Sequence, residues 1–123
     1  MNSLELQTRL RNFAYRVVTV CEALPKKKIA IVIEHQILRS SFSAAANYRA
    51  ATKAQSQKSF VAKLSIAFEE IDESLFWLES IKDLNIITEK KLSSIIKETA
   101  ELASILAAAR KTMQLKLKTN INS

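Results

Sequence analysis

The 123-residue sequence contains no glycine, a single proline (Pro25) and a single cysteine (Cys21). The absence of glycine excludes phosphate-binding loops and Rossmann-type dinucleotide turns, in which the backbone must approach a phosphate closely. Tight two-residue hairpins also depend on glycine for positive φ angles. One cysteine excludes an internal disulfide, and on an apolar helix stripe it indicates core packing. The composition therefore favours helices over β-sheets and nucleotide-binding α/β folds.

Residues that carry metal or catalytic chemistry are few. His35 is the one histidine, and with a single cysteine it cannot form an ordinary zinc site. The acidic residues of segment 69–79 invite comparison with di-metal carboxylate bundles, but those require Glu-x-x-His on two helices, which this sequence lacks. We therefore expect no enzyme activity, no metal, no cofactor and no small-molecule substrate, and we interpret His35 as a surface or interface imidazole.

Long apolar runs are also missing. Near the N-terminus, Arg9, Arg11 and Arg16 interrupt any apolar segment of the kind a signal peptide needs. The longest apolar run near a predicted helix start, Ile29–Ile33, is far shorter than the roughly 18 residues of a membrane span. We expect a soluble, cytoplasmic protein without membrane contact. This β-branched run could form a strand alone, but the residues after it keep helical spacing and predict a helix.

Apolar residues recur at steps of three and four through four segments, which is the spacing of one helix face. They predict a single domain over residues 1–123 with helices at about 4–24, 27–51, 56–82 and 88–116 and a frayed tail at 117–123. Ser3, Ser56 and Thr88 are the expected N-caps, Pro25 ends the first helix, and Asn85 takes the left-handed conformation that glycine usually adopts. Short connections then predict an all-α, antiparallel up-down-up-down four-helix bundle.

Two of the predicted helices carry more apolar residues than the core of one bundle needs. The surplus residues are Val61, Ile66, Phe76, Trp77 and Ile81 in helix 56–82, and Ile31, Ile33, Leu38 and Phe42 in helix 27–51. Large apolar patches usually mark interfaces, which Trp and Phe often anchor. We therefore predict a homo-oligomer. The alternative is a monomer in which Trp77 covers one end of the core.

The chain carries 19 Lys and Arg against 12 Asp and Glu, a net charge of +7. Such a charge favours association with a polyanion or with an acidic protein surface. The candidate nucleic-acid contacts are Arg9, Arg11, Arg16, Lys26, Lys27, Lys28, Arg110, Lys111, Lys116 and Lys118. An ordinary solvated basic surface explains them equally well. No aromatic residues interleave with them, so the sequence gives no indication of base stacking.

Two arginines of helix 27–51 require partners. Arg39 and Arg49 lie among alanines and serines that let helices approach closely, and a guanidinium in that setting needs a carboxylate. Glu70 and Glu73 are one turn apart and share a helix face. We predict that these charges hold helix 27–51 to helix 56–82 or to a neighbouring subunit. The alternative is that Glu69 to Glu79 form a solvated face.

Three stretches resemble a known family: Leu24-Pro25, residues 35–50 and residues 56–78. The residues that carry the resemblance are Gln36, Arg39, Ser40, Ser43, Asn47 and Tyr48, followed by Phe60, Lys63, Leu64, Ile66, Ala67, Glu70, Glu73, Trp77 and Leu78. The pattern is similar to that of the four-helix bundle proteins first described from open reading frames inside 23S rRNA intervening sequences. The resemblance covers residues 24–82, and the flanking helices match the family only in the helical spacing of their apolar residues. Ala50 stands where the family usually has Glu, and Phe68 stands where Gly or Lys is common.

The resemblance implies a four-helix protomer assembled into a homopentamer, in a family without an established enzymatic activity. The chain is more distantly similar to the accessory variability determinant of diversity-generating retroelements, a basic pentameric bundle that engages reverse transcriptase and RNA. We predict a non-enzymatic scaffold or adaptor that binds RNA or another nucleic acid through its basic surface. The alternative is a protein-binding adaptor for a nucleic-acid enzyme such as a reverse transcriptase. The predicted structural or interface residues are Arg39, Asn47, Tyr48, Arg49, Glu70, Glu73, Phe76 and Trp77.

Overall fold

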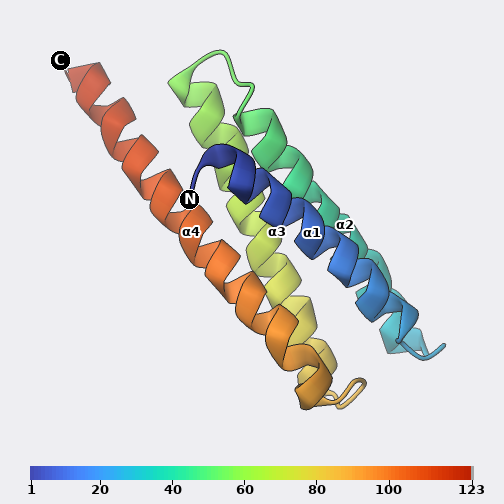
Figure 1. Ribbon diagram of the computed structural model, residues 1–123. Coiled ribbons are helices and arrows are strands. Elements are labelled where there is room, and N and C mark those ends of the chain that lie inside the picture. The colour runs from blue at the N-terminus through green and yellow to red at the C-terminus, as the bar shows by residue number, and fades with distance from the viewer. Residues whose placement is uncertain (123) are drawn as a thin grey trace.

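The computed structural model describes the backbone of residues 1–122 and the side chains of residues 1–119. This part of the chain forms four α-helices and contains no strand (Figure 1). The helices are α1 (Ser3–Glu22), α2 (Lys28–Ala51), α3 (Gln57–Asp83) and α4 (Glu89–Asn122). The prediction of an all-α fold with four helices is confirmed.

Local side chains explain where the helices begin and end. Asn2, and not Ser3 as predicted, caps α1: its Oδ1 accepts a hydrogen bond from the Glu5 amide at 2.8 Å. Ser56 caps α3 as predicted, since its Oγ accepts from the Ser59 amide at 3.0 Å. Asn85, in the connection after α3, has φ 55°, which confirms its predicted left-handed conformation. Side chains of Asn and Ser therefore cap the starts of α1 and α3, whereas α2 begins without a side-chain cap.

The α4 helix is longer than its sequence pattern predicted. We expected it to end at Lys116 and the tail 117–123 to fray, but the helix continues to Asn122, and Ser123 lies outside the described residues. Met113 and Leu117, one turn apart, are both partly buried and continue the apolar stripe. No proline or glycine interrupts these last turns. A stripe of only two residues was too short to recognise as a helical pattern.

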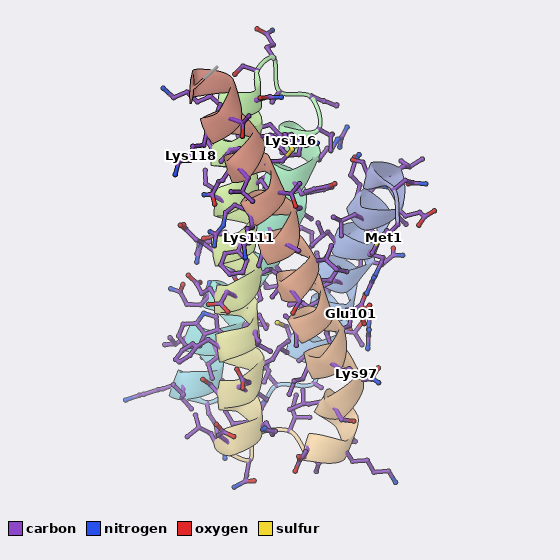
Figure 2. The ribbon with its side chains drawn as sticks, turned by 90° about the vertical axis from the view of Figure 1, so that its left-hand side faces the viewer. Met1, Lys97, Glu101, Lys111, Lys116 and Lys118 are labelled. Carbon is purple, nitrogen blue, oxygen red and sulfur yellow. The ribbon has the colours of Figure 1, made fainter. Side chains whose placement is uncertain are left out.

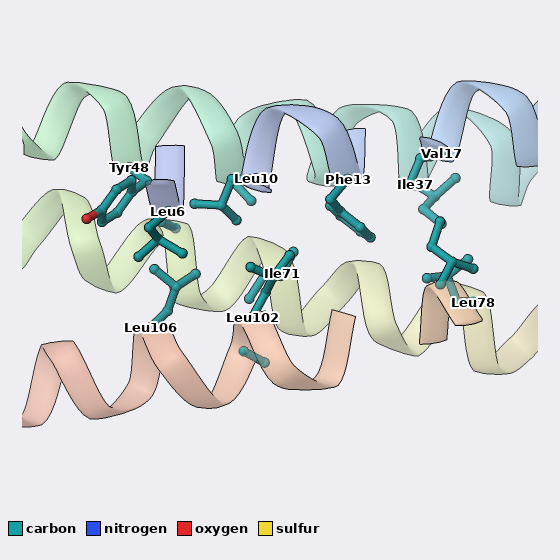
Figure 3. Packing of buried hydrophobic residues seen from close by; sticks show 14 of the residues in the cluster. Leu6, Leu10, Phe13, Val17, Ile37, Tyr48, Ile71, Leu78, Leu102 and Leu106 are labelled. Atoms are coloured by element: carbon teal, nitrogen blue, oxygen red, sulfur yellow. The ribbon is translucent and has the colours of Figure 1, made fainter. Parts of the chain in front are cut away.

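The helices pack in chain order around one apolar core, with α2 against α3, α3 against α4 and α1 against α2. The contact between α1 and α4 is the smallest of the four. Figure 3 shows core residues from all four helices meeting, among them Phe13, Ile37, Ile71 and Leu102, each fully or almost fully excluded from solvent. Burial of such side chains contributes roughly 1.5–3 kcal/mol each. The apolar stripes read from the sequence are thus the main stabilising surfaces of the fold.

The Ile29–Ile33 run lies within α2 and is helical, as predicted. Ala30 and Ile33 face the core, while Ile29, Ile31 and Val32 are exposed. Spacing over the whole segment therefore outweighs the β-branched composition of its first turns.

Candidate functional site

The predicted cluster of charges between helices α2 and α3 is present. Arg39 on α2 points between two carboxylates of α3: its Nη1 donates to Glu70 Oε2 at 2.7 Å and its Nη2 donates to Glu73 Oε2. Trp77 Nε1 donates to the same Glu73 oxygen at 3.3 Å. One guanidinium therefore joins two successive turns of α3, which their spacing of three residues makes possible.

Two small residues beside this cluster let the helices approach closely. Ser40 on α2 and Ser74 on α3 are fully buried, and their Oγ atoms lie 2.7 Å apart. Ser74 also donates to the Glu70 carbonyl oxygen at 3.0 Å. Both hydroxyls are thus satisfied inside the protomer, as buried polar groups must be.

The Arg39 cluster is partly screened by solvent. The Arg39 side chain is 49% exposed, whereas that of Glu70 is 17% exposed. Burial lowers the pKa of Arg39, but the hydrogen bonds and charges of Glu70 and Glu73 outweigh it, so the pKa is raised overall. The guanidinium remains charged, and its exposed side is accessible to a further partner.

Arg49 does not join the acidic cluster, contrary to the prediction. Its side chain lies on the α1 side of α2, where it lines a hollow together with Gln7, Arg11 and Tyr15 of α1. No carboxylate pairs with Arg49 among residues 1–119. The predicted pairing of Arg49 with α3 is wrong within the protomer, because ten residues separate Arg39 from Arg49, which turns Arg49 by about 80° around α2 toward a different neighbour. Its contact with a neighbouring subunit stays a prediction.

Asn47 and Tyr48, also predicted as structural or interface residues, make contacts within the protomer. Asn47 Nδ2 donates to the Ser43 carbonyl oxygen at 2.9 Å and to Ser43 Oγ at 3.1 Å. Tyr48 is buried, and its hydroxyl donates to Ser3 Oγ at 3.2 Å, which joins the end of α2 to the start of α1.

Three of the ten candidate nucleic-acid contacts are occupied by intramolecular partners. Arg9 pairs with Glu98 at 2.6 Å and with Glu101 at 3.3 Å, so its charge is neutralised within the protomer. Arg16 Nη2 donates to Ser94 Oγ at 3.1 Å. The Arg110 guanidinium lies 4.2 Å from the centre of the Phe68 ring, a cation–π contact. Phe68, which departs from the family pattern, thus packs against the guanidinium of Arg110.

The remaining seven candidate cations lie on the surface without a carboxylate partner in the described part of the chain. They are Arg11, Lys26, Lys27, Lys28, Lys111, Lys116 and Lys118. Figure 2 shows the last three along the upper part of α4, with Lys116 and Lys118 nearest its end. Lys26 and Lys27 lie in the connection between α1 and α2, and Lys28 is the first residue of α2. The unpaired positive charge therefore lies in separate places along the molecule.

The surplus apolar residues divide between core and surface. Ile33 and Ile81 are completely buried, so their assignment to an external patch was wrong; both contribute to the core stripe. Phe76 is 57% exposed and packs edge-on against Trp77 with ring centres 4.9 Å apart. Ile31, Ile66 and Phe42 are exposed as well. Apolar side chains therefore remain exposed on α2 and α3, but fewer than the sequence predicted.

Sequence reasoning missed an aromatic pair between α1 and α2. Tyr15 and Phe42 are 55% and 41% exposed, and their ring centres lie 6.2 Å apart. They line the hollow that also contains Arg11 and Arg49. The statement that no aromatic residues interleave with the basic residues overlooked Tyr15, which lies between Arg11 and Arg16, whereas Phe42 comes from a different helix. The spacing of Arg11 and Tyr15, one turn apart on α1, was the available signal.

The rest of the molecule offers little other chemistry. Cys21 is buried, and burial together with Glu34 raises the pKa of its thiol to about 11. Within the described residues, no group of three or more His, Cys, Asp or Glu is placed to hold a metal ion. None of the described helices is long and apolar enough to span a membrane.

Four packed helices with a charge-bridged α2–α3 contact and an unpaired basic surface define a small helical-bundle protein. Residues 2–108 match the family model of the 23S rRNA-intervening sequence proteins. This chain belongs to the 23S rRNA-intervening sequence protein family. The match extends the resemblance, which the sequence carried over residues 24–82, to all four helices.

A solved structure has the same fold. A Bacteroides thetaiotaomicron protein of unknown function, assigned to the S23 ribosomal protein family, superposes with a TM-score of 0.81 and is 33% identical. The similarity covers 90% of the present chain and 99% of that protein. No curated protein sequence matches this chain. The comparisons therefore identify a family of unknown function.

Proposed function

We propose that this chain is a non-enzymatic, homo-oligomeric subunit that binds RNA through its unpaired basic surface. The observation that supports RNA binding is the set of surface cations that have no carboxylate partner among the described residues. This set includes the Lys26–Lys28 run and Lys111, Lys116 and Lys118. Lysine and arginine side chains attract phosphates by releasing condensed counterions. In an oligomer, each such cluster is repeated with every subunit.

We propose an antiparallel up-down-up-down arrangement for the protomer. Short connections join the helices, and the contacts pair the start of one helix with the end of its neighbour. Ser3 meets Tyr48, Arg16 meets Ser94, and Phe60 lines a hollow with Met113. The chain path in Figure 1 is consistent with this order.

The oligomer is supported by the exposed Phe76 beside Trp77 and by the uneven charge of the chain. Segment 1–63 holds eleven basic and three acidic residues, whereas segment 64–104 holds four basic and nine acidic residues. Opposite charges on different parts of one chain favour contacts between copies. Membership of the family supports a pentamer as the specific assembly.

Binding to a structured RNA, measured by filter retention over a range of salt concentrations, tests the RNA assignment. We expect strong binding at about 50 mM salt and a steep loss toward 200 mM, because counterion release dominates such contacts. Absence of binding at about 50 mM salt would contradict the proposal and favour an adaptor that contacts an acidic protein.

A further inference from the structure

A shallow groove between α1 and α2 combines two arginines with two aromatic rings. Its volume is about 140 Å³. Its lining residues are Gln7, Arg11, Ala14 and Tyr15 of α1 and Phe42, Ala45, Ala46 and Arg49 of α2. A volume well under the roughly 300–1,000 Å³ of small-molecule pockets suits one flat group rather than an enclosed metabolite.

The charge of the groove is entirely positive. Arg11 projects from α1 and Arg49 from α2, and no carboxylate lines the groove. Neither arginine has an ion pair among residues 1–119, in contrast to Arg9 and Arg39, which are held by glutamates. Two guanidiniums that share one groove are arranged to receive an anion with several acceptor oxygens, such as a phosphate.

The aromatic pair supplies the second half of a nucleotide-binding surface. Tyr15 and Phe42 keep about half of their area in solvent although they touch each other at an interplanar angle of 46°. Exposed rings beside cations are how proteins bind single-stranded nucleic acid: the bases stack on the rings and the cations follow the backbone. Neither ring belongs to the buried core cluster, in contrast to the neighbouring Phe13 of α1.

We propose that this groove binds one step of single-stranded RNA, with the phosphate held by Arg11 and Arg49 and a base stacked on Tyr15 or on Phe42. The inference rests on the proposed RNA-binding function, and it specifies where on the molecule the RNA binds and through which contacts. Stacking accepts any base, so the groove binds without sequence preference. The competing occupant is the acidic α3 face of a second copy, with Glu69, Asp72 and Phe76, and the experiment distinguishes the two.

Fluorescence anisotropy with a labelled oligouridine of about 12 nucleotides tests the groove. Arg11→Gln/Arg49→Gln should weaken binding and reduce the magnitude of the slope of log K against log salt by about 0.7, because the two arginines hold one phosphate and each neutralised phosphate on a single strand contributes about 0.7. Tyr15→Leu/Phe42→Leu should weaken binding by about fivefold or more without changing that slope. A phosphate effect and a stacking effect are thus separated by their salt dependence.

Lys53→Gln/Lys63→Gln is the matched control. It removes the same charge from two exposed lysines that lie outside the groove and outside the candidate RNA contacts. Its binding and slope should stay close to those of the wild-type chain. Circular dichroism should show unchanged helix content in all three variants, because every substituted side chain is exposed.

Three results would overturn the inference. If the wild-type chain binds RNA but the groove variants behave like the control, the groove is not the binding place, although the proposed function stands. If Arg11→Gln/Arg49→Gln lowers the mass in light scattering, the groove holds a second copy. If the wild-type chain binds no RNA, the inference fails together with the proposed function.

Discussion

Arg9 on α1 donates two hydrogen bonds to the carboxylate of Glu98 on α4: Nη2 lies 2.6 Å from Oε1, and Nε lies 3.2 Å from Oε2. This pair bridges the smallest helix–helix contact in the protomer. Hydrogen bonding to Glu98 raises the pKa of Arg9, and Glu101 adds to the effect. The arginine is therefore part of the fold, although its sequence position resembles that of a free surface cation.

Substitution of Arg9 should affect stability and not RNA binding. We expect Arg9→Gln to lower the free energy of unfolding by about 1 kcal/mol and the melting temperature by about 4 °C, because the partly buried Glu98 and the exposed Glu101 lose their partner. Thermal unfolding followed by circular dichroism measures this. RNA affinity equal to that of the wild-type chain is the second expectation, and a loss of affinity with unchanged stability would contradict the assignment.

Arg39 should contribute less to stability than its two ion pairs would suggest. Its side chain is half exposed, so solvent screens the pairs, and we expect Arg39→Ala to cost less than about 1 kcal/mol in the isolated protomer. A larger loss, together with a lower mass in light scattering, is expected if the cluster also contacts a neighbouring subunit. Lys63→Ala, at an exposed and unpaired position of α3, is the control. An unchanged melting temperature and mass in Arg39→Ala would refute a structural role.

The buried thiol of Cys21 should make stability depend on pH in the alkaline range. Its pKa is raised from 9.0 to about 11, so the unfolded chain loses this proton first. The contribution to stability is complete below pH 9 and disappears as the pH rises from 9 to 11. We expect the wild-type chain to lose stability over this range faster than Cys21→Ala does, as measured by urea unfolding. Parallel pH profiles of the two proteins would contradict the assignment.

Asn85 should tolerate glycine better than alanine. Its φ of 55° falls in the left-handed region, where a Cβ atom without a compensating hydrogen bond costs roughly 1 kcal/mol. We expect Asn85→Ala to lower the midpoint of urea unfolding and Asn85→Gly to leave it nearly unchanged, since glycine adopts this conformation without strain. Equal effects of the two substitutions would show that backbone conformation does not matter at this turn.

The helices and one ion-pair cluster could be predicted because both depend on spacing along a single segment. The steps of three and four residues predicted which side of each helix is buried, and Glu70 and Glu73 are one turn apart whatever lies opposite them. Arg39 was then recognised as their partner because its neighbours are small. Asn85 was recognisable because the chain has no glycine to take its place.

The partners of the other arginines depend on helix register, which one sequence does not reveal. Arg9 and Glu98 are 89 positions apart and meet only because of the way α1 lies on α4. Phe42 joins Tyr15 for the same reason, across the α1–α2 contact. Side chains that look equivalent in the sequence, such as Arg9 and Arg11, therefore have different roles: the first is neutralised within the fold, and the second has no ion pair among residues 1–119.

Light scattering during size-exclusion chromatography of the full chain mixed with a structured RNA tests the central claim most directly. At about 50 mM salt, where phosphate contacts are strong, we predict that protein and RNA elute together. We also predict that the chain alone elutes at a multiple of its 13.8 kDa mass. Elution of the protein as a 13.8 kDa monomer, separate from the RNA, would contradict the account of a homo-oligomeric RNA-binding subunit.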